Sequence, residues 1–283
     1  MKIRVPFLAL AVLLLNSAAA NAQQRPLVTE DPETIGSGLV LIEAGFDNLR
    51  EIFFPASGIT GDLLRLPTLG VSFGVSSIAE IQVDGAIFNR LTINELQPAP
   101  LAYRLDFTGD HTSGIDDLVI GTKIRLAPEA PGRPAVGVRF ATKLPFASTE
   151  EGVGLGTTDF FASFLIGKTV QSVRIVGNGG IGILGDPVNG DKTGQVLTYG
   201  VSVARAVRQG VEVVGELDAR WSMEDDEHTP VGSENRGAVR FGARFTKATV
   251  RIDGGVIFGL SSRDPSFGFT TGLTWVFRGF TIP

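Results

Sequence analysis

Apolar and polar residues alternate along most of this chain, and the stretch from Gly114 to Pro145 shows the pattern most clearly. Apolar residues and threonines occupy every second position from Leu118 to Leu126, and they do so again from Val136 to Leu144. Charged residues fall between them. A period of two predicts β-strands, and the proline- and glycine-rich connection Pro128–Pro134 predicts an antiparallel hairpin. The hairpin alone does not show whether its charged face meets bulk water or lines an enclosed interior.

The same alternation recurs along the whole chain. We count 12 such runs, and each has the length of about 9–11 residues that a tilted strand needs to cross a bilayer. They centre on Gly38–Asp47, Leu63–Val75, Glu80–Arg90, Asp117–Leu126, Ala135–Leu144, Asp159–Ile166, Val173–Ile183, Val196–Val203, Val211–Trp221, Val239–Phe245, Val250–Leu260 and Phe267–Phe277.

The apolar faces of these runs favour contact with lipid. No charged residue interrupts any of them, as in the face formed by Val71, Phe73 and Val75. An Arg or Lys on such a face costs about 2–4 kcal/mol at the bilayer midplane, so this absence is informative. In lipid every backbone group needs a partner within the protein, and an antiparallel sheet provides all of them only by closing. The predicted fold is therefore all-β, a closed antiparallel transmembrane β-barrel of about 12 strands in an up-and-down meander.

The gaps between the runs give independent support, because long and short gaps alternate. Outer-membrane barrels have short periplasmic turns and longer external loops, and chain ends on the periplasmic side require an even number of strands. The connection Ser261–Ser266 is short for an external loop. The expected long gaps are Asn48–Asp62, Leu91–Asp116, Pro145–Thr158, Leu184–Gln195 and Ser222–Ala238, and the expected short gaps are Ser76–Ala79, Ala127–Pro134, Gly167–Ser172, Ala204–Gly210 and Thr246–Thr249.

The amino-terminal residues predict export. Lys2 and Arg4 precede a short apolar core from Phe7 to Leu15, and small residues end at Ala22. This is the pattern of a cleaved signal peptide over residues 1–22, too short in its apolar part for a membrane helix. Residues 23–37 then form an extended periplasmic lead-in, whose acidic residues could alternatively enter the barrel beside Arg or Lys. The barrel spans residues 38–278, residues 279–283 are a C-terminal tail, and the expected location is the outer membrane of a Gram-negative-type bacterium.

Composition narrows the possible classes of protein. The chain has no cysteine, which excludes a disulfide scaffold and a thiolate metal site. The formal net charge of −5 argues against a nucleic-acid partner, since nucleic acids select basic faces. The 36 glycines and 19 phenylalanines suit a barrel with many turns and a large apolar outer surface.

The charged face of each run would line the lumen, where neighbouring strands alternate in sign. Cross-strand pairs of opposite charge support sheet pairing, so a structural ion-pair network is one interpretation. A selective pore is the other, because rings of charge set selectivity. The predicted lumen-lining residues are Glu80, Asp84, Asp117, Lys123, Arg125, Arg139, Lys143, Asp159, Arg174, Glu212, Glu216, Asp218, Arg220, Arg240, Arg244, Arg251 and Asp253.

No motif in the sequence predicts catalysis. We expect no catalytic, cofactor-binding or metal-binding residues and no enzyme activity. The acidic stretch Met223–His228 has carboxylates that could bind Ca²⁺, but a solvated external loop is the simpler interpretation. His111 and His228 both fall in expected loops, where nothing orients them beside a serine. The glycine-rich stretch Gly152–Gly156 lacks the lysine and the following helix of a phosphate-binding loop.

The last run ends on alternating polar and aromatic residues that are similar to the C-terminal signal of outer-membrane barrels. We therefore expect the barrel-assembly machinery to recognise the chain through Thr270, Gly272, Trp275 and Phe277. The short tail after Phe277 departs from the usual form of the signal, in which the aromatic residue is the last one. The other expected partners are outer-membrane lipid and a small-molecule solute, and a monomer is expected.

Five stretches of the chain together resemble one known family. They are RPLVTEDPETI, GIDDLVIGTKIRL, VGVRFATKLPF, GLGTTDFFASFLIGK and VRIVGNGGIGILGDP. They look like the MetA-pathway of phenol degradation family of transporter-like outer-membrane proteins, over nearly the whole chain after residue 22. The resemblance implies a small porin-like barrel, sometimes linked with uptake of aromatic or other hydrophobic compounds. It implies no defined binding residues.

Two functions from different classes follow. The first is an outer-membrane channel for passive transport of a small solute, such as an aromatic or other small organic compound. The alternative is a non-conducting structural or adhesive barrel whose lumen is closed by salt bridges. Heat-modifiable gel mobility and membrane fractionation would separate both from a soluble periplasmic β protein.

Overall fold

The computed structural model describes residues 25–225 and 229–281, which form β-strands and one short 3-10 helix, η1 (Ala102–Arg104). The expected signal peptide lies outside the described residues. The strands are β1 (Leu39–Phe54), β2 (Ile59–Gly74), β3 (Ala79–Ala86), β4 (Asn89–Leu96), β5 (His111–Gly114), β6 (Leu118–Ala127), β7 (Ala135–Leu144), β8 (Asp159–Val170), β9 (Val173–Gly185), β10 (Thr193–Arg208), β11 (Val211–Ser222), β12 (Arg236–Lys247), β13 (Val250–Gly259) and β14 (Phe267–Arg278).

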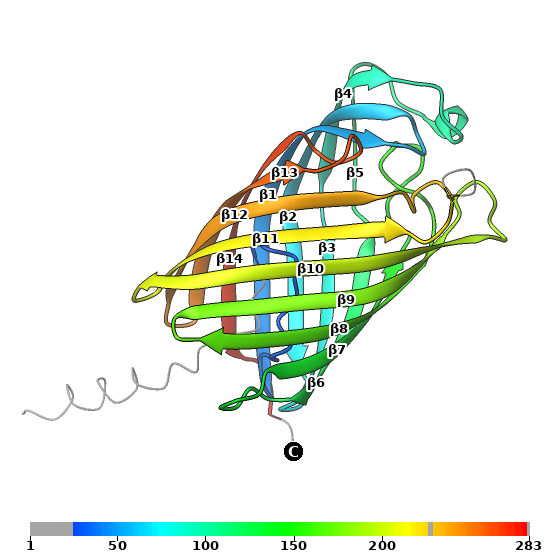
Figure 1. The fold of residues 1–283 in the computed structure, drawn as a ribbon. Helices are drawn as coiled ribbons and strands as arrows, with labels where there is room; N and C mark the ends of the chain where they lie inside the picture. Colours follow the sequence, from blue (N-terminus) through cyan, green and yellow to red (C-terminus); the bar gives the residue numbers. More distant parts are fainter. Residues whose placement is uncertain (1–24, 226–228, 282–283) are drawn as a thin grey trace, which may run out of the picture.

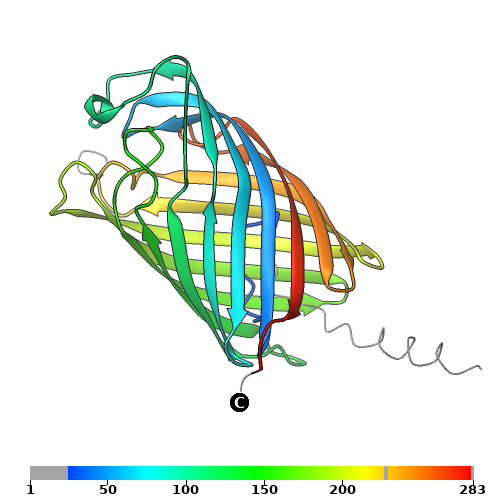
Figure 2. The same cartoon turned by 180° about the vertical axis from the view of Figure 1, so that it is seen from behind.

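These strands form one closed antiparallel sheet. Strand β1 pairs with β14 on one side and with β2 on the other, so the sheet has no break (Figures 1 and 2). Strand β2 pairs with β3 along Thr68–Gly74 and with β4 along Ile59–Arg65. Strands β3 and β4 therefore share one place around the barrel, and β6 and β5 share the next. The 14 strands of the sheet thus occupy 12 places, which confirms the predicted up-and-down barrel.

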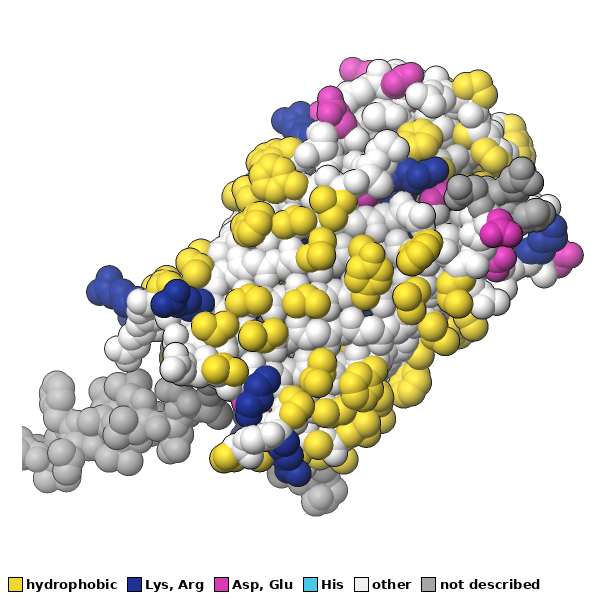
Figure 3. Space-filling model, in the orientation of Figure 1, with side chains coloured by type: hydrophobic (Ala, Val, Ile, Leu, Met, Phe, Trp, Pro, Cys, Tyr) yellow, Lys and Arg dark blue, Asp and Glu magenta, His cyan; other side chains and the backbone are white. Residues whose placement is uncertain are grey.

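The outer surface carries the apolar faces that the sequence predicts. Phe160 on β8 is 54% exposed and Trp221 on β11 is 62% exposed, values that water would not favour but lipid would. Figure 3 shows apolar side chains spread over the middle of the wall, with charged side chains mainly towards its two ends. In the hairpin of β6 and β7, Ile120 and Phe140 face outward while Lys123 is fully buried. The charged face of this hairpin therefore points into the barrel.

The two ends of the barrel differ. Strand β1 begins and β14 ends at the end of the barrel where short connections join β2 to β3, β8 to β9, β10 to β11 and β12 to β13; we call it the turn end. The opposite end carries the longer connections, and we call it the loop end. One expected long gap, Asn48–Asp62, is wrong, because β1 and β2 continue until only residues 55–58 connect them.

The expected gaps fail for a physical reason. Beyond the lipid, polar residues such as Arg50 and Asp62 are compatible with a strand, so the two-residue alternation that marks a lipid-facing strand is lost. Two register shifts, between Gly45 and Asp47 and between Leu49 and Ile52, disturb it further. The gap Leu91–Asp116 likewise holds the end of β4, η1 and β5. The short gap Ala204–Gly210 shrinks to residues 209–210 because β10 is longer than expected.

An apolar cluster lies inside the barrel at the loop end. It consists of buried residues on β1, β2, β4, β12 and β13, and residues of the long loops pack against it. The buried members of the cluster are Leu49, Ile52, Ile59, Leu63, Leu91, Ala238 and Ile257.

No helix of the described residues is long and apolar enough to cross a membrane.

Candidate functional site in the barrel lumen

The described residues before β1 run through the interior of the barrel. We call Arg25–Ser37 the lumen segment; it follows the inner wall in Figure 2. The Thr29 N–H donates to the Glu216 carboxylate at 2.6 Å, and the Ile35 N–H donates to the Glu80 carboxylate at 2.7 Å. This part of the predicted lead-in therefore lies in the lumen rather than in the periplasm. The physical reason is that lumen carboxylates accept the segment's backbone N–H groups, which have no strand partner.

Inward-facing glycines make room for the lumen segment. The Arg25 guanidinium lies directly over Gly45 on β1 and Gly272 on β14, where any added side chain would overlap it. Other glycines serve Pro26 and Pro32 in the same way: a Cβ at Gly242 would lie 2.7 Å from Pro26, and one at Gly167 would lie 3.1 Å from Pro32. The room for the lumen segment therefore depends on glycines of several strands, which the closed barrel places along the course of the segment.

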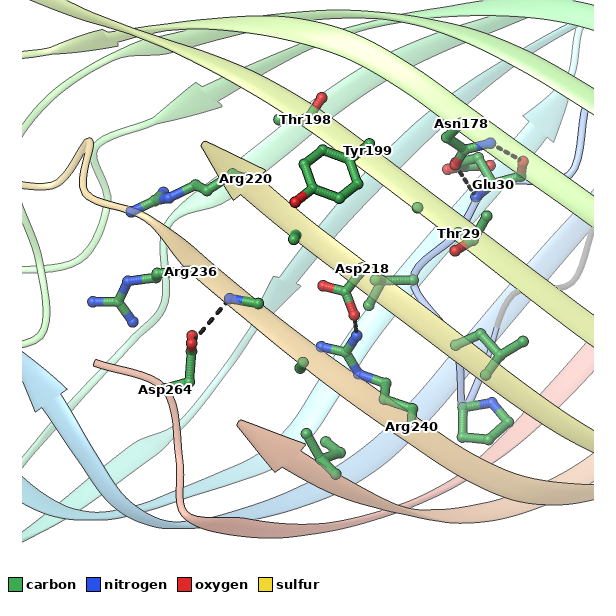
Figure 4. Close-up of a pocket in the computed structure, with 18 of the residues that line it drawn as sticks. Thr29, Glu30, Asn178, Thr198, Tyr199, Asp218, Arg220, Arg236, Arg240 and Asp264 are labelled. Atoms are coloured by element: carbon green, nitrogen blue, oxygen red, sulfur yellow. Dashed lines mark hydrogen bonds and ion pairs between the residues drawn. The ribbon is translucent and has the colours of Figure 1, made fainter. Parts of the chain in front are cut away.

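Lys123 is the centre of a dry ion-pair cluster. Its side chain on β6 is 0% exposed, and its Nζ lies 3.2 Å from a Glu30 carboxylate oxygen and 3.0 Å from one of Glu80. Arg139 on β7 contacts the other Glu30 oxygen at 3.0 Å. Glu30 also forms a reciprocal pair of backbone hydrogen bonds with the Asn178 side chain, at 2.6 Å and 2.8 Å (Figure 4). The lumen segment is thus fixed by charge as well as by shape.

Two further acids of the lumen segment bind arginines near the turn end. Arg174 on β9 contacts Asp31 at 2.6 Å, and Arg125 on β6 contacts Glu33 at 2.5 Å. Glu129, in the connection between β6 and β7, also accepts from Arg174. Partial burial acts to raise the pKa of Glu129, but hydrogen bonds from the Thr169 N–H and the Lys168 ammonium lower it. The net pKa is below the usual value of a glutamate.

The remaining predicted lumen charges also pair with one another. Arg240 on β12 contacts Glu216 at 3.0 Å and also contacts Asp218, both on β11. Lys143 lies 2.9 Å from Asp117 and 3.0 Å from Asp159. Asp84 lies 3.8 Å from Arg139, and Glu212 lies 3.8 Å from Arg251. The wall is therefore a network in which most charges have a partner of opposite sign.

Arg244 on β12 lies opposite Glu212 on β11 in the register of the sheet. Arg244 donates its Nε hydrogen to the Arg25 carbonyl oxygen at 2.7 Å, so it holds the lumen segment. Arg251 and Asp253 on β13 are buried, and Asp253 lies 3.9 Å from Arg25. Within the described part of the chain, Arg220 has its closest carboxylate in Glu234, at 4.0 Å. The sequence places these residues on the inner face but does not identify their partners, because the lumen segment changes them.

Several lumen residues are absent from the predicted set. Asp47 on β1 contacts Arg25 at 3.3 Å, and Gln82 on β3 accepts from Arg139 at 2.7 Å. Asp47 lies opposite the apolar face of Ile42 and Phe46, so the alternation itself carries its signal. Arg236 is missed because the predicted run starts at Val239, whereas β12 begins at Arg236. Further residues outside the predicted set are Arg25, Arg65 and Asn178. Glu30, Asp31 and Glu33 lie beside Arg or Lys in the lumen, where the alternative interpretation of the lead-in puts its acidic residues.

Two cavities lie on opposite sides of the lumen segment. The loop-end cavity has a volume of 520 Å³ and reaches Arg220, Arg236 and Asp264 (Figure 4). The turn-end cavity has a volume of 540 Å³ and reaches Pro128 and Ser172. Leu27 and Thr29 line both cavities. This short part of the lumen segment is therefore the barrier between the two halves of the lumen.

Other stretches that the sequence singles out lie away from this space. His111 begins β5 and contacts Asp110 at 3.1 Å, outside the lumen. The carbonyl oxygen of Gly152 accepts from the Ser57 hydroxyl at 2.7 Å, so the glycine-rich stretch packs at the loop end. Residues 226–228 of the acidic stretch lie outside the described residues. Within the described ranges, no three histidines or carboxylates are grouped as metal ligands.

Comparison with known proteins places the chain in a family. The model of a family described as "Putative MetA-pathway of phenol degradation" matches residues 24–277. This chain belongs to that family. The match includes both the barrel and the lumen segment of this MetA-pathway family member. No curated protein matches the chain.

Solved structures share the fold. An outer-membrane channel of the COG4313 group from Pseudomonas putida F1 superposes with a TM-score of 0.62 at 14% identity, covering 87% of this chain and 98% of the channel. The NanC porin superposes with a TM-score of 0.51 at 10% identity, covering 83% of this chain and 98% of the porin. At these identities the likeness shows the fold alone. The MetA-pathway family member thus has the architecture of an outer-membrane barrel.

Proposed function

We propose that this protein is an outer-membrane channel through which a small organic solute passes by diffusion. The observation that carries this proposal is the pair of cavities of 520 Å³ and 540 Å³, separated by Leu27 and Thr29 of the lumen segment. A solute that passes the segment would move from one cavity to the other. The lumen segment is then the constriction of the channel, and its neighbours set what passes.

The expected placement in the membrane follows from the outer surface. The apolar side chains of β8 to β14 would meet lipid, with the turn end in the periplasm and the loop end outside the cell. The predicted signal peptide would deliver the chain to the periplasm of a Gram-negative-type bacterium. We propose that the assembly machinery binds β14, where Trp275 and Phe277 stack with ring centroids 4.4 Å apart. One barrel is closed by itself, so we propose a monomer.

The chemistry of the described lumen favours passage over catalysis. Most of its charged residues face each other as ion pairs, and the one described histidine, His111, lies on β5 outside the lumen. A hydrolase would need a nucleophile within reach of an oriented base. We therefore propose a non-enzymatic role.

A second candidate function is a structural or adhesive barrel that conducts nothing. The fully buried ion-pair cluster of Lys123, Glu30 and Glu80 favours it, because a barrier held this firmly would keep the lumen closed. The long loops at the loop end would then be the functional surface. This candidate shares the fold and the location of the first and differs from it only in conductance.

Conductance of the purified full chain in a planar bilayer tests the proposal. We expect discrete openings at low salt and swelling of liposomes in small organic solutes. Heat-modifiable mobility on a gel, measured on the same sample, shows that the barrel is folded. A folded protein that leaves the bilayer silent and the liposomes unswollen would support the structural or adhesive barrel instead.

A further inference from the structure

Two arginines face each other across neighbouring strands in the loop-end cavity. Arg220 on β11 is directly opposite Arg236 on β12 in the register of the sheet, and both line the cavity. Like charges in directly opposite positions destabilise a sheet. The other cavity-facing pair on these strands, Asp218 and Arg240, has opposite charges (Figure 4). Lys123 on β6 and Arg139 on β7 also lie directly opposite each other, but these two cations share the carboxylate of Glu30.

The donors of these two arginines go to neutral acceptors. Arg220 donates to the carbonyl oxygens of Glu234 at 3.0 Å and Gly232 at 2.6 Å. Arg236 donates to the carbonyl oxygens of Arg263 at 3.0 Å and Phe53 at 3.2 Å. These bonds orient both guanidinium groups but leave their charge uncompensated. The Nε atom of Arg236 is buried and has no hydrogen-bond partner among the described residues.

Asp264, another carboxylate that lines the cavity, forms hydrogen bonds to other groups. Asp264 accepts hydrogen bonds from the Gly237 N–H at 2.9 Å, the Ser261 N–H at 3.1 Å and the Ser261 hydroxyl at 2.6 Å. It therefore holds the connection between β13 and β14 in place. Elsewhere in the cavity, Arg139 and Arg25 have carboxylates at 3.0 Å and 3.3 Å. Among the described residues, Arg236 has no ion pair and Arg220 has only the one with Glu234, at 4.0 Å, so the least compensated positive charge of the cavity lies at these two arginines.

The wall beside the arginine pair leaves room for a ligand. The register places Thr198 on β10, Gly180 on β9 and Ser163 on β8 in one row with Arg220, and all three have small side chains or none. The cavity volume of 520 Å³ falls in the range of about 300–1,000 Å³ that small-molecule sites occupy. The small side chains in this row therefore leave open cavity space next to the guanidinium group of Arg220.

The rest of this cavity has an apolar side. Leu49, Leu165 and Ile257 are buried residues that line it, and Phe161 lines it from β8. A fully hydrated inorganic ion would gain nothing from these side chains. A compact apolar body would lose unfavourable contact with water there. The cavity therefore combines a cationic end with an apolar wall.

We propose that the loop-end cavity binds a small organic anion, with its carboxylate at Arg220 and Arg236 and its compact apolar body against Leu49, Leu165 and Phe161. This names the solute class of the proposed channel and so rests on the proposed function. Arginine suits the task because its planar guanidinium matches a carboxylate geometrically. The site would hold the anion on the loop-end side of Leu27 and Thr29, before the constriction.

Isothermal titration calorimetry on the full chain in nanodiscs tests the site, with benzoate as the probe. We expect benzoate to bind more tightly than acetate, which lacks the apolar body, and than benzyl alcohol, which lacks the charge. The double variant Arg220→Gln, Arg236→Gln should weaken benzoate binding about ten- to a hundredfold, because charge-assisted hydrogen bonds are lost. Arg50→Gln, which removes an exposed arginine outside the cavity, should bind benzoate as the wild type does.

A second variant covers the case in which the double variant does not fold, as judged by heat-modifiable gel mobility. Phe161→Ala should weaken benzoate binding several-fold and leave acetate binding unchanged. Equal binding of benzoate and benzyl alcohol, or unchanged benzoate binding in the double variant, would overturn the site. Benzoate binding to a protein that is silent in bilayers would refute the channel but keep the site. Conductance without any benzoate binding would refute the site alone.

Discussion

The two regions of the lumen treat charge in different ways. Around the lumen segment, most charges have a close partner of opposite sign, and Lys123 is completely buried between Glu30 and Glu80. In the loop-end cavity, Arg220 and Arg236 donate to carbonyl oxygens instead. Neutralised charge fixes a segment in place, whereas uncompensated charge beside open space is available to a ligand. One polar inner wall can thus contain both a barrier and a binding site.

The largest expected effect comes from breaking the dry cluster. Lys123→Met leaves Glu30 and Glu80 buried without a shared cation, and removing one partner of a buried pair costs about 3–5 kcal/mol. We expect a clear fall in the temperature at which the heat-modifiable gel shift occurs. Adding Glu80→Gln to this variant should recover part of the loss, because Glu30 keeps its contact with Arg139 and Glu80 no longer carries a charge.

A matched lysine sharpens this test. Lys168 contacts Glu129 at 3.2 Å but its side chain is 33% exposed. Lys168→Met should change stability by only about 0–1 kcal/mol, as surface ion pairs do. If the two methionine variants lose the same stability, then burial does not distinguish the lumen segment from the surface, and the contrast drawn above is wrong.

A smaller effect should follow from placing a side chain at one of the glycines that contact Arg25. Gly45→Ala places a methyl group where the Arg25 guanidinium lies, so Arg25 must leave Thr68 and Thr270, to which it donates at 2.8 Å each. We expect the lumen segment to loosen while the barrel stays closed. The chain has no cysteine, so a single Val28→Cys reporter can be labelled with a maleimide without background. Labelling should be several-fold faster in the Gly45→Ala background.

The control for this experiment is another strand glycine. A Cβ at Gly179 on β9 would meet nothing within 4 Å. Gly179→Ala should therefore leave the labelling rate of the cysteine reporter unchanged. Equal acceleration by both substitutions would mean that the labelling rate reports on a general change in the sheet and not on the contact between Arg25 and Gly45.

The apolar outer faces could be predicted because lipid imposes a strict period of two on them. Hence Phe160, Ile120 and Trp221 are all assigned correctly from the alternation. The path of the lumen segment could not be predicted in detail, because it depends on the register that brings Gly45 beside Gly272. The charges of a wall can be read along one strand, but their partners depend on several strands at once.

The site at Arg220 and Arg236 illustrates the same limit. Arg220 belongs to the predicted lumen residues, and its strand pattern shows its direction. Arg236 lies beyond the predicted run because β12 starts before its apolar alternation does. Only the pairing of β11 with β12 sets the two arginines opposite each other.

The smallest expected effect concerns pH at the turn end. The folded-state pKa of Glu129 is lowered, so its contribution to stability is present above the ordinary pKa of a glutamate. This contribution is lost as the pH falls through the lowered pKa. Glu129→Gln should therefore slightly lower stability at neutral pH and flatten its decline in acid. A thermal gel-shift series from neutral to acidic pH measures this, and identical slopes for both proteins would contradict it.

The most direct test is the single-channel conductance of a protein whose lumen segment has been released. Glu30→Gln together with Glu216→Gln weakens the contact of Glu30 with Lys123 and Arg139 and the hydrogen bonds from the Val28 and Thr29 N–H groups. The matched control replaces two exposed acids, Glu95→Gln with Glu150→Gln. We predict small discrete openings in the wild type and the control, and a several-fold larger conductance in the released variant. The same conductance in all three folded proteins, or silence in all three, would contradict a channel constricted by its own lumen segment.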